Sequence, residues 1–153
     1  MRIVLFEPEI PPNTGNIARL CAATRTPLHL IEPLGFSIDD KHLKRAGLDY
    51  WPHVDVTVHP DFDQFIETVA PPRLVMATTK ARTAHHRFGF RADDAIVLGP
   101  ETRGLPRELM EGHPRVRIPI WGEVRSLNLS TATGILLFEA LRQTDSIVDV
   151  FPA

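Results

Sequence analysis

Short apolar runs alternate with helical patterns along this 153-residue chain. Several of the runs are continuously apolar, which is typical of strands that are covered on both faces. Strands are predicted at residues 3–6, 28–31, 54–58, 74–78, 95–98 and 116–118, and helices at 16–24, 40–46, 61–69, 106–111 and 129–143. The alternation predicts an α/β fold with a mostly parallel sheet flanked by helices.

Length and composition restrict the class of protein. The chain fits a single domain over residues 1–153, with no internal repeat and no linker. It has one cysteine, Cys21, which excludes an intramolecular disulfide and fits a reducing cytoplasm. No apolar run is long enough to cross a membrane. The 7 histidines show no tight ligand spacing, so no metal site is expected.

The formal net charge is −2, so the whole protein is not a polycation. Binding to nucleic acid would need a local basic patch. One candidate is the segment 80–91, which contains Lys80, Arg82, Arg87 and Arg91 and no acidic residue. Two interpretations stay open at this point, a solvated loop and a surface that contacts phosphates.

Polar residues follow the first predicted strand. The segment 11–19 begins with two prolines, and Asn13 or Thr14 is expected to cap the following helix. Asn16 and Arg19 lie three residues apart on a face turned away from the core, so they could reach one ligand together. The alternative is a capped helix that carries a surface arginine.

A glycine-rich turn follows the predicted strand 95–98. Gly99 and Gly104 have the glycine spacing of a P-loop, but Leu105-Pro106 stand where lysine and a hydroxyl residue would be needed. A nucleoside triphosphatase is therefore excluded, and the missing GxGxxG pattern argues against a dinucleotide enzyme. The turn instead lets backbone approach a ligand, with Glu101 beside it.

The last candidate segment precedes the predicted helix 129–143. It carries more hydroxyl and amide residues than one helix cap needs, namely Ser126, Asn128, Ser130 and Thr131. The surplus indicates polar groups that converge on a ligand at the start of the helix. A cap with redundant polar residues is the alternative.

Taken in order, these segments resemble the SPOUT class of RNA 2′-O-methyltransferases, and most of all the subgroup that methylates the ribose of tRNA nucleotide 34. The resemblance is carried by residues 6–16, 46–50, 78–80 and 99–104, and it covers essentially the whole chain. It implies an α/β fold with a C-terminal deep trefoil knot, a homodimer and S-adenosylmethionine as the cofactor.

The resemblance also implies a set of site residues. The cofactor pocket would consist of Ala77, Thr78, Leu98, Gly99, Glu101, Ile118, Ile120, Ser126, Leu127 and Asn128. The residues that match the family's active site are Asn13, Arg19, Glu101, Ser126 and Asn128. Lys80, Arg82, Arg87 and Arg19 are expected to contact RNA.

The expected activity is 2′-O-methylation of the wobble nucleotide, C or U, of tRNA, without a metal or a membrane. The resemblance implies that Arg19 acts as the base for the ribose hydroxyl, the role described for this position in the family. A guanidinium hardly ever loses its proton in proteins, so a phosphate contact that stabilises developing charge is the preferred role. Two alternatives are the same chemistry on another RNA, such as ribosomal RNA, and a catalytically silent RNA-binding module.

Overall fold

The computed structural model describes residues 1–39, 41, 45 and 50–149. Within these ranges the strands form one six-stranded sheet in the order β3-β2-β1-β5-β4-β6, and every neighbouring pair is parallel. The strands are β1 (Arg2–Phe6), β2 (Leu28–Ile31), β3 (Val56–His59), β4 (Leu74–Ala77), β5 (Ala95–Leu98) and β6 (Arg115–Val116). The prediction of a mostly parallel α/β sheet is confirmed.

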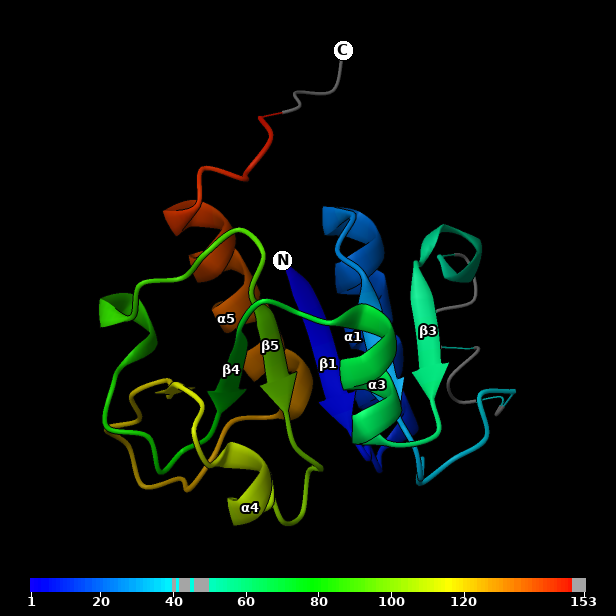
Figure 1. Ribbon diagram of the computed structural model, residues 1–153, viewed down its shortest axis with the longest axis horizontal. Helices are drawn as coiled ribbons and strands as arrows, with labels where there is room; N and C mark the ends of the chain where they lie inside the picture. The colour runs from blue at the N-terminus through cyan, green and yellow to red at the C-terminus, as the bar shows by residue number, and fades with distance from the viewer. Residues whose placement is uncertain (40, 42–44, 46–49, 150–153) are drawn as a thin grey trace.

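Helices cover both faces of the sheet (Figure 1). The described helices are α1 (Pro11–Thr24), α3 (Phe62–Val69), α4 (Arg107–Met110) and α5 (Leu129–Gln143), with 3₁₀ turns η1 (Trp51–His53) and η2 (His85–Arg87). The residues of α1 and α5 share a core with Ile3 and Leu5, whereas those of α3 and α4 pack with Val4. Successive β1 side chains thus point to opposite faces, as the strand periodicity requires.

Helix α1 begins at Pro11 rather than at residue 16. The two prolines suit the first helical turn, where a missing N–H leaves no hydrogen bond unmade. The N-cap residue is Ile10, which makes no side-chain cap, so the predicted cap by Asn13 or Thr14 is wrong. The amide of Asn13 has partners outside the helix instead.

Other boundaries differ by one or two residues. Strand β6 ends at Val116 instead of residue 118 because the next residue, Arg117, turns to a different partner and forms an isolated parallel bridge with Ala84. Strand β3 begins later than predicted and ends on a buried histidine, His59. The predicted helix 40–46 lies largely outside the described residues.

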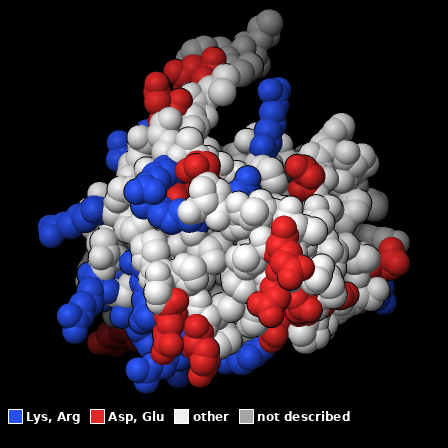
Figure 2. Space-filling model, in the orientation of Figure 1, with Lys and Arg blue, Asp and Glu red and all other residues white. Residues whose placement is uncertain are grey.

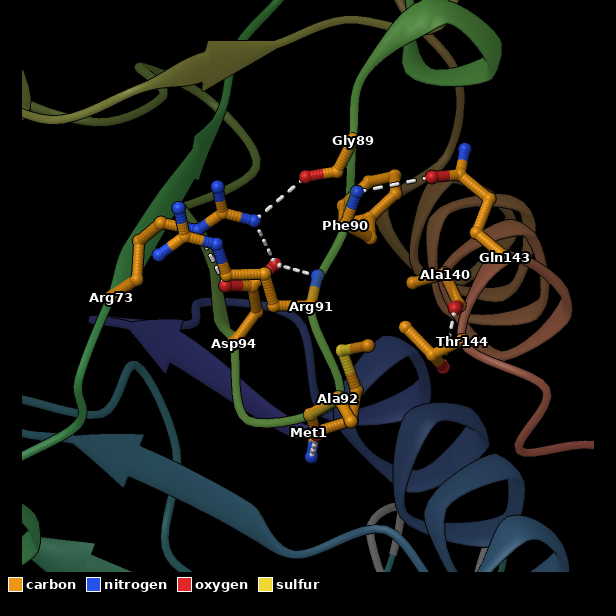
Figure 3. Close-up of polar contacts among 10 residues, drawn as sticks. All are labelled: Met1, Arg73, Gly89, Phe90, Arg91, Ala92, Asp94, Ala140, Gln143 and Thr144. Carbon is orange, nitrogen blue, oxygen red and sulfur yellow. Dashed lines mark hydrogen bonds and ion pairs between the residues drawn. The ribbon is translucent and has the colours of Figure 1, made fainter.

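A buried carboxylate fixes the ends of β4 and β5 opposite the carboxyl edge (Figure 3). Asp94 is fully buried and accepts hydrogen bonds from Nε and Nη2 of Arg73, both at 2.6 Å. It also accepts from the backbone N–H of Arg91 at 2.8 Å, while Arg73 donates to the carbonyl of Gly89. A buried charge needs such partners, and they hold the turn before β5 in one conformation.

A pair of buried histidines joins β2 and β3. Nδ1 of His29 lies 3.0 Å from Nε2 of His59, and both rings pack against Phe65. Burial lowers the pKa of both imidazoles, and it lowers that of His29 to about 4. The folded protein therefore holds His29 neutral where an unfolded chain would bind a proton.

This difference predicts that acid weakens the fold. The ordinary pKa of histidine is 6.5 and the folded value for His29 is about 4. The stabilising contribution is present above pH 6.5 and is lost as the pH falls toward 4, by at most about 3 kcal/mol. Chemical denaturation across this range should show a steeper fall for wild type than for His29→Gln, which carries no titrating group there. Equal falls in the two proteins would contradict the assignment.

Candidate cofactor and RNA site

The carboxyl ends of β4, β5 and β6 lie side by side. Ala77 pairs in register with Leu98 on one side and with Val116 on the other. The backbone N–H of Thr78 donates to the carbonyl of Val116 at 3.0 Å. The loops that begin at Thr78, Gly99 and Arg117 therefore start from adjacent positions at one edge, where ligands collect in parallel sheets.

The carboxylate of Glu101 joins the loop after β5 to the loop after β1. It accepts hydrogen bonds from the backbone N–H groups of Glu9, at 2.8 Å, and Ile10, at 3.0 Å. It also accepts from Nδ2 of Asn13 at 3.3 Å. The three donors come from residues about ninety positions away in the chain, so this carboxylate is a tertiary connection rather than a local turn contact.

The same two loops are held by a reciprocal set of contacts. The carboxylate of Glu9 accepts from the backbone N–H of Thr102 at 3.1 Å and from its hydroxyl at 2.9 Å. Arg103 forms an ion pair with Glu7. The sequence analysis did not identify Glu7 or Glu9 as site residues, although both lie directly after the first strand and within residues 6–16, which carry the resemblance.

Asn128 has two roles, as the cap of a helix and as a polar group that contacts another part of the candidate site. Its Oδ1 accepts from the backbone N–H of Ser130 at 2.9 Å and from that residue's hydroxyl at 2.7 Å, so it caps α5. Its Nδ2 donates to Oδ1 of Asn13 at 2.9 Å. Asn13 on α1, Glu101 after β5 and Asn128 at the start of α5 thus form one continuous network, which is the part of the predicted active site that the structure brings together.

Gly99 is required by the conformation of its own loop. A Cβ at this position would lie 2.3 Å from the backbone nitrogen of Leu105 and 2.4 Å from the carbonyl carbon of Gly104. The loop closes through a hydrogen bond from the Gly104 N–H to the Pro100 carbonyl, and Gly104 has a φ of +68°. The sequence analysis inferred that backbone approaches a ligand closely at Gly99. In the structure, the backbone of Gly104 and Leu105 makes this close approach.

The other predicted pocket residues differ in exposure. Leu98 is buried and Ser126 is exposed, whereas the half-buried members are Ala77, Thr78, Gly99, Glu101, Ile118, Ile120 and Leu127. Half-buried apolar side chains suit an adenosine group, which needs apolar faces. The apolar residues of the predicted pocket therefore fit S-adenosylmethionine.

Arg19 lies apart from the network. Its side chain is exposed on α1, and its guanidinium carbon lies 4.3 Å from the centre of the Tyr50 ring, a cation–π contact. Among the described residues, no hydrogen bond or ion pair joins Arg19 to Asn13, Glu101 or Asn128. Sequence reasoning missed the aromatic partner as a site residue, although residue 50 ends one of the motifs that carry the resemblance.

The basic segment after β4 is exposed. Lys80, Arg82 and Arg87 all have exposed side chains. Figure 2 shows Lys and Arg side chains along the left edge of the molecule, where the segment with η2 lies in Figure 1. The negative formal net charge of the chain thus coexists with a locally basic edge.

A separate hollow lies at the carboxyl ends of β2 and β3. It has a volume of about 590 Å³ and is lined by Glu32, Pro33, Leu34, Phe36, Ser37, Ile38, Val58 and Pro60. None of the predicted site residues lines it. It is a rival location for a small ligand.

Within residues 1–39, 41, 45 and 50–149, no helix combines the length and the apolar character that a bilayer crossing requires. No group of three or more His, Cys, Asp or Glu residues in the same ranges is arranged to hold a metal ion.

Glu101 provides a test of the network. Replacing it by glutamine turns one acceptor oxygen into an NH₂ group that faces N–H donors. Glu101→Gln should therefore lower the free energy of unfolding by about 1–3 kcal/mol in urea denaturation. Glu108→Gln, which changes an exposed carboxylate on α4, is the matched control and should leave it nearly unchanged. Equal stability of the two variants would remove Glu101 from any structural role.

Comparison with known proteins identifies the family of this chain. A model described as the SpoU rRNA Methylase family matches residues 1–138. A tRNA (cytidine(34)-2'-O)-methyltransferase of Aeromonas hydrophila is 55% identical over 144 residues, which are 92% of each chain.

Solved structures agree with this match. One, on the 2-OH methylation of C/U34 on tRNA, has a TM-score of 0.88 at 48% identity, covering 93% of this chain and 94% of its own. An AdoMet-bound rRNA methyltransferase from Sinorhizobium meliloti has a TM-score of 0.83 at 25% identity, covering 92% of this chain and 55% of its own. The family resemblance is thereby confirmed, and the chain belongs to the SpoU methylase family.

Proposed function

We propose that this protein transfers a methyl group from S-adenosylmethionine to the ribose 2′-oxygen of the wobble nucleotide, C or U at position 34, of tRNA. The observation that carries the proposal is the Asn13–Glu101–Asn128 network at the carboxyl edge of the sheet. Its three residues are among the five that match the family's active site. Relatives at 50% and 55% identity are named tRNA (cytidine(34)-2'-O)-methyltransferases.

The residues of the chain mainly position the reactants. S-adenosylmethionine supplies a methyl group already activated by its sulfonium. Ile118, Ile120 and Leu127 offer apolar surface for the nucleoside, and Thr78 and Ser126 offer hydroxyl groups. Both carboxylate oxygens of Glu101 are already acceptors for donors of the chain, so its role is to hold the loops rather than to take the ribose proton.

Arg19 acts as an electrostatic group in this mechanism. A guanidinium is a poor base, so it binds the phosphate beside the target ribose and stabilises negative charge as the 2′-hydroxyl loses its proton to solvent water. The Tyr50 ring covers one side of the guanidinium and restricts its motion. Lys80, Arg82 and Arg87 contact phosphates farther along the RNA.

We further infer a single domain over residues 1–153 with a C-terminal trefoil knot. Two contacts across the segment between β4 and β5 support the knot. The backbone N–H of Phe90 donates to Oε1 of Gln143 at the end of α5, and Ala84 pairs with Arg117. In a knot, the final helix would thread through a loop that includes this segment. The two contacts connect that loop to later parts of the chain.

A homodimer completes the proposal, in the cytoplasm where tRNA is available. Large apolar side chains are exposed on α5 and on the loop before it, with 47% of Phe138 and 93% of Trp121 accessible. Self-complementary apolar surface is what a two-fold interface uses. Because Arg19 makes no contact with the network of its own chain, we assign it to the cofactor bound by the partner subunit.

The function is tested by methyl transfer from radiolabelled S-adenosylmethionine to bulk tRNA and, separately, to ribosomal RNA. The labelled nucleotide is then located by mass spectrometry of digested RNA. The proposal predicts one 2′-O-methyl group, at nucleotide 34 of a subset of tRNAs. Label in ribosomal RNA alone would support the alternative substrate, and cofactor binding without transfer to either RNA would support the silent module.

The shared site is tested by mixed dimers. Arg19→Ala and Gly99→Ala are co-expressed with different tags, the second because a Cβ at residue 99 cannot fit beside the backbone of Leu105. If Arg19 serves the partner's cofactor, one of two sites in the mixed dimer is complete, and activity should return to roughly half of wild type. Each variant alone should be inactive. An inactive mixed dimer, with both variants folded and dimeric, would contradict the shared site.

A further inference from the structure

A basic pocket lies beside the end of β6. It has a volume of about 480 Å³ and is lined by Arg82, Thr83, Ala84, His86, Arg87, Arg117 and Pro119. This set, here called the arginine pocket, holds three arginines and a histidine and no carboxylate. The arginine pocket and the basic segment predicted from the sequence contain different residues. Lys80 belongs to the segment but does not line the pocket, whereas Arg117 lines the pocket and comes from another part of the chain.

Backbone pairing builds the pocket. Ala84 and Arg117 form a parallel bridge, which is framed by two hydrogen bonds. The N–H of Arg117 donates to the carbonyl of Thr83 at 3.0 Å, and the N–H of His85 donates to the carbonyl of Arg117 at 2.8 Å. The turn η2 follows at once and brings Arg87 to the same wall. Two extended segments thus hold the arginines, which a freely solvated loop would not do.

The arginines of the pocket lack acidic partners. Arg82, Arg87 and Arg117 are all exposed, and no ion pair within the described ranges involves any of them. Like charges held close together repel one another, and a bound anion relieves this repulsion. Guanidinium groups match phosphate oxygens with paired N–H donors, which makes phosphate the anion that fits best.

We propose that the arginine pocket binds a backbone phosphate of the RNA substrate. The proposal rests on the proposed function, because it takes the substrate to be RNA. Arg117 directly precedes Ile118, one of the residues expected around the cofactor. A phosphate in this pocket is therefore anchored next to the reacting edge of the sheet, and it would fix how the strand enters the site.

The test measures tRNA affinity at several salt concentrations for wild type, Arg117→Ala and Arg117→Lys. Loss of one charged contact should weaken tRNA binding about tenfold in Arg117→Ala. It should also reduce the slope of log affinity against log salt by about 0.7–0.9, the value for one phosphate. Arg117→Lys keeps the charge and should keep most of the slope. Arg107→Ala, an exposed arginine on α4 outside the pocket, is the matched control and should match wild type.

S-adenosylmethionine affinity and thermal unfolding should be the same in all four proteins. A salt slope for Arg117→Ala equal to that of the control would overturn the proposal. Calorimetry with inorganic phosphate provides a second contradicting outcome. If inorganic phosphate saturates the pocket of wild type but not that of Arg117→Ala, while the tRNA salt slope is the same in both proteins, the proposal is overturned as well. Methyl transfer by wild type is measured on the same tRNA, so a failure of the proposed function is seen separately from a failure of this pocket.

Discussion

The parallel pairing of every described strand is the constraint from which the rest of the site follows. Parallel strands end at the same edge, so the loops after β1, β4, β5 and β6 meet there although they are far apart in sequence. The meeting is then fixed by side chains. The carboxylate of Glu101 takes two donors from the loop after β1 and a third from Asn13 on α1, and that of Glu9 takes two donors from the loop after β5.

The hydrogen-bonded network and the cations lie in different places and suit different functions. The network of Asn13, Glu101 and Asn128 is satisfied within the chain, so it gives the edge a fixed shape and leaves little capacity for proton transfer. The cations lie outside it, with Arg19 stacked on Tyr50 and the arginine pocket beyond β6. Fixed loops suit a reaction whose methyl donor is already activated, and exposed cations suit a polyanionic substrate.

The sequence predicted the sheet well because buried parallel strands leave continuous apolar runs, as in residues 95–98, which form β5 as expected. It predicted less well where side chains have partners elsewhere in the chain. Asn13 follows two prolines and has the chemistry of a cap, but its amide binds Glu101 and Asn128, and only the tertiary structure reveals this. In the same way the pairing of Arg117 with Ala84 joins residues that no periodicity relates, so the sequence predicted Arg82 and Arg87 as basic surface residues but not the place of Arg117 beside them.

Amide hydrogen exchange with and without S-adenosylmethionine tests most directly whether the cofactor binds at the edge formed by β4, β5 and β6. Exchange reports local opening of the backbone, which a bound ligand suppresses. If it does, the cofactor should slow exchange in residues 98–105 and 117–128, with no change in residues 32–38 at the separate hollow. Protection confined to residues 32–38, with 98–105 and 117–128 unaffected, would contradict cofactor binding at this edge.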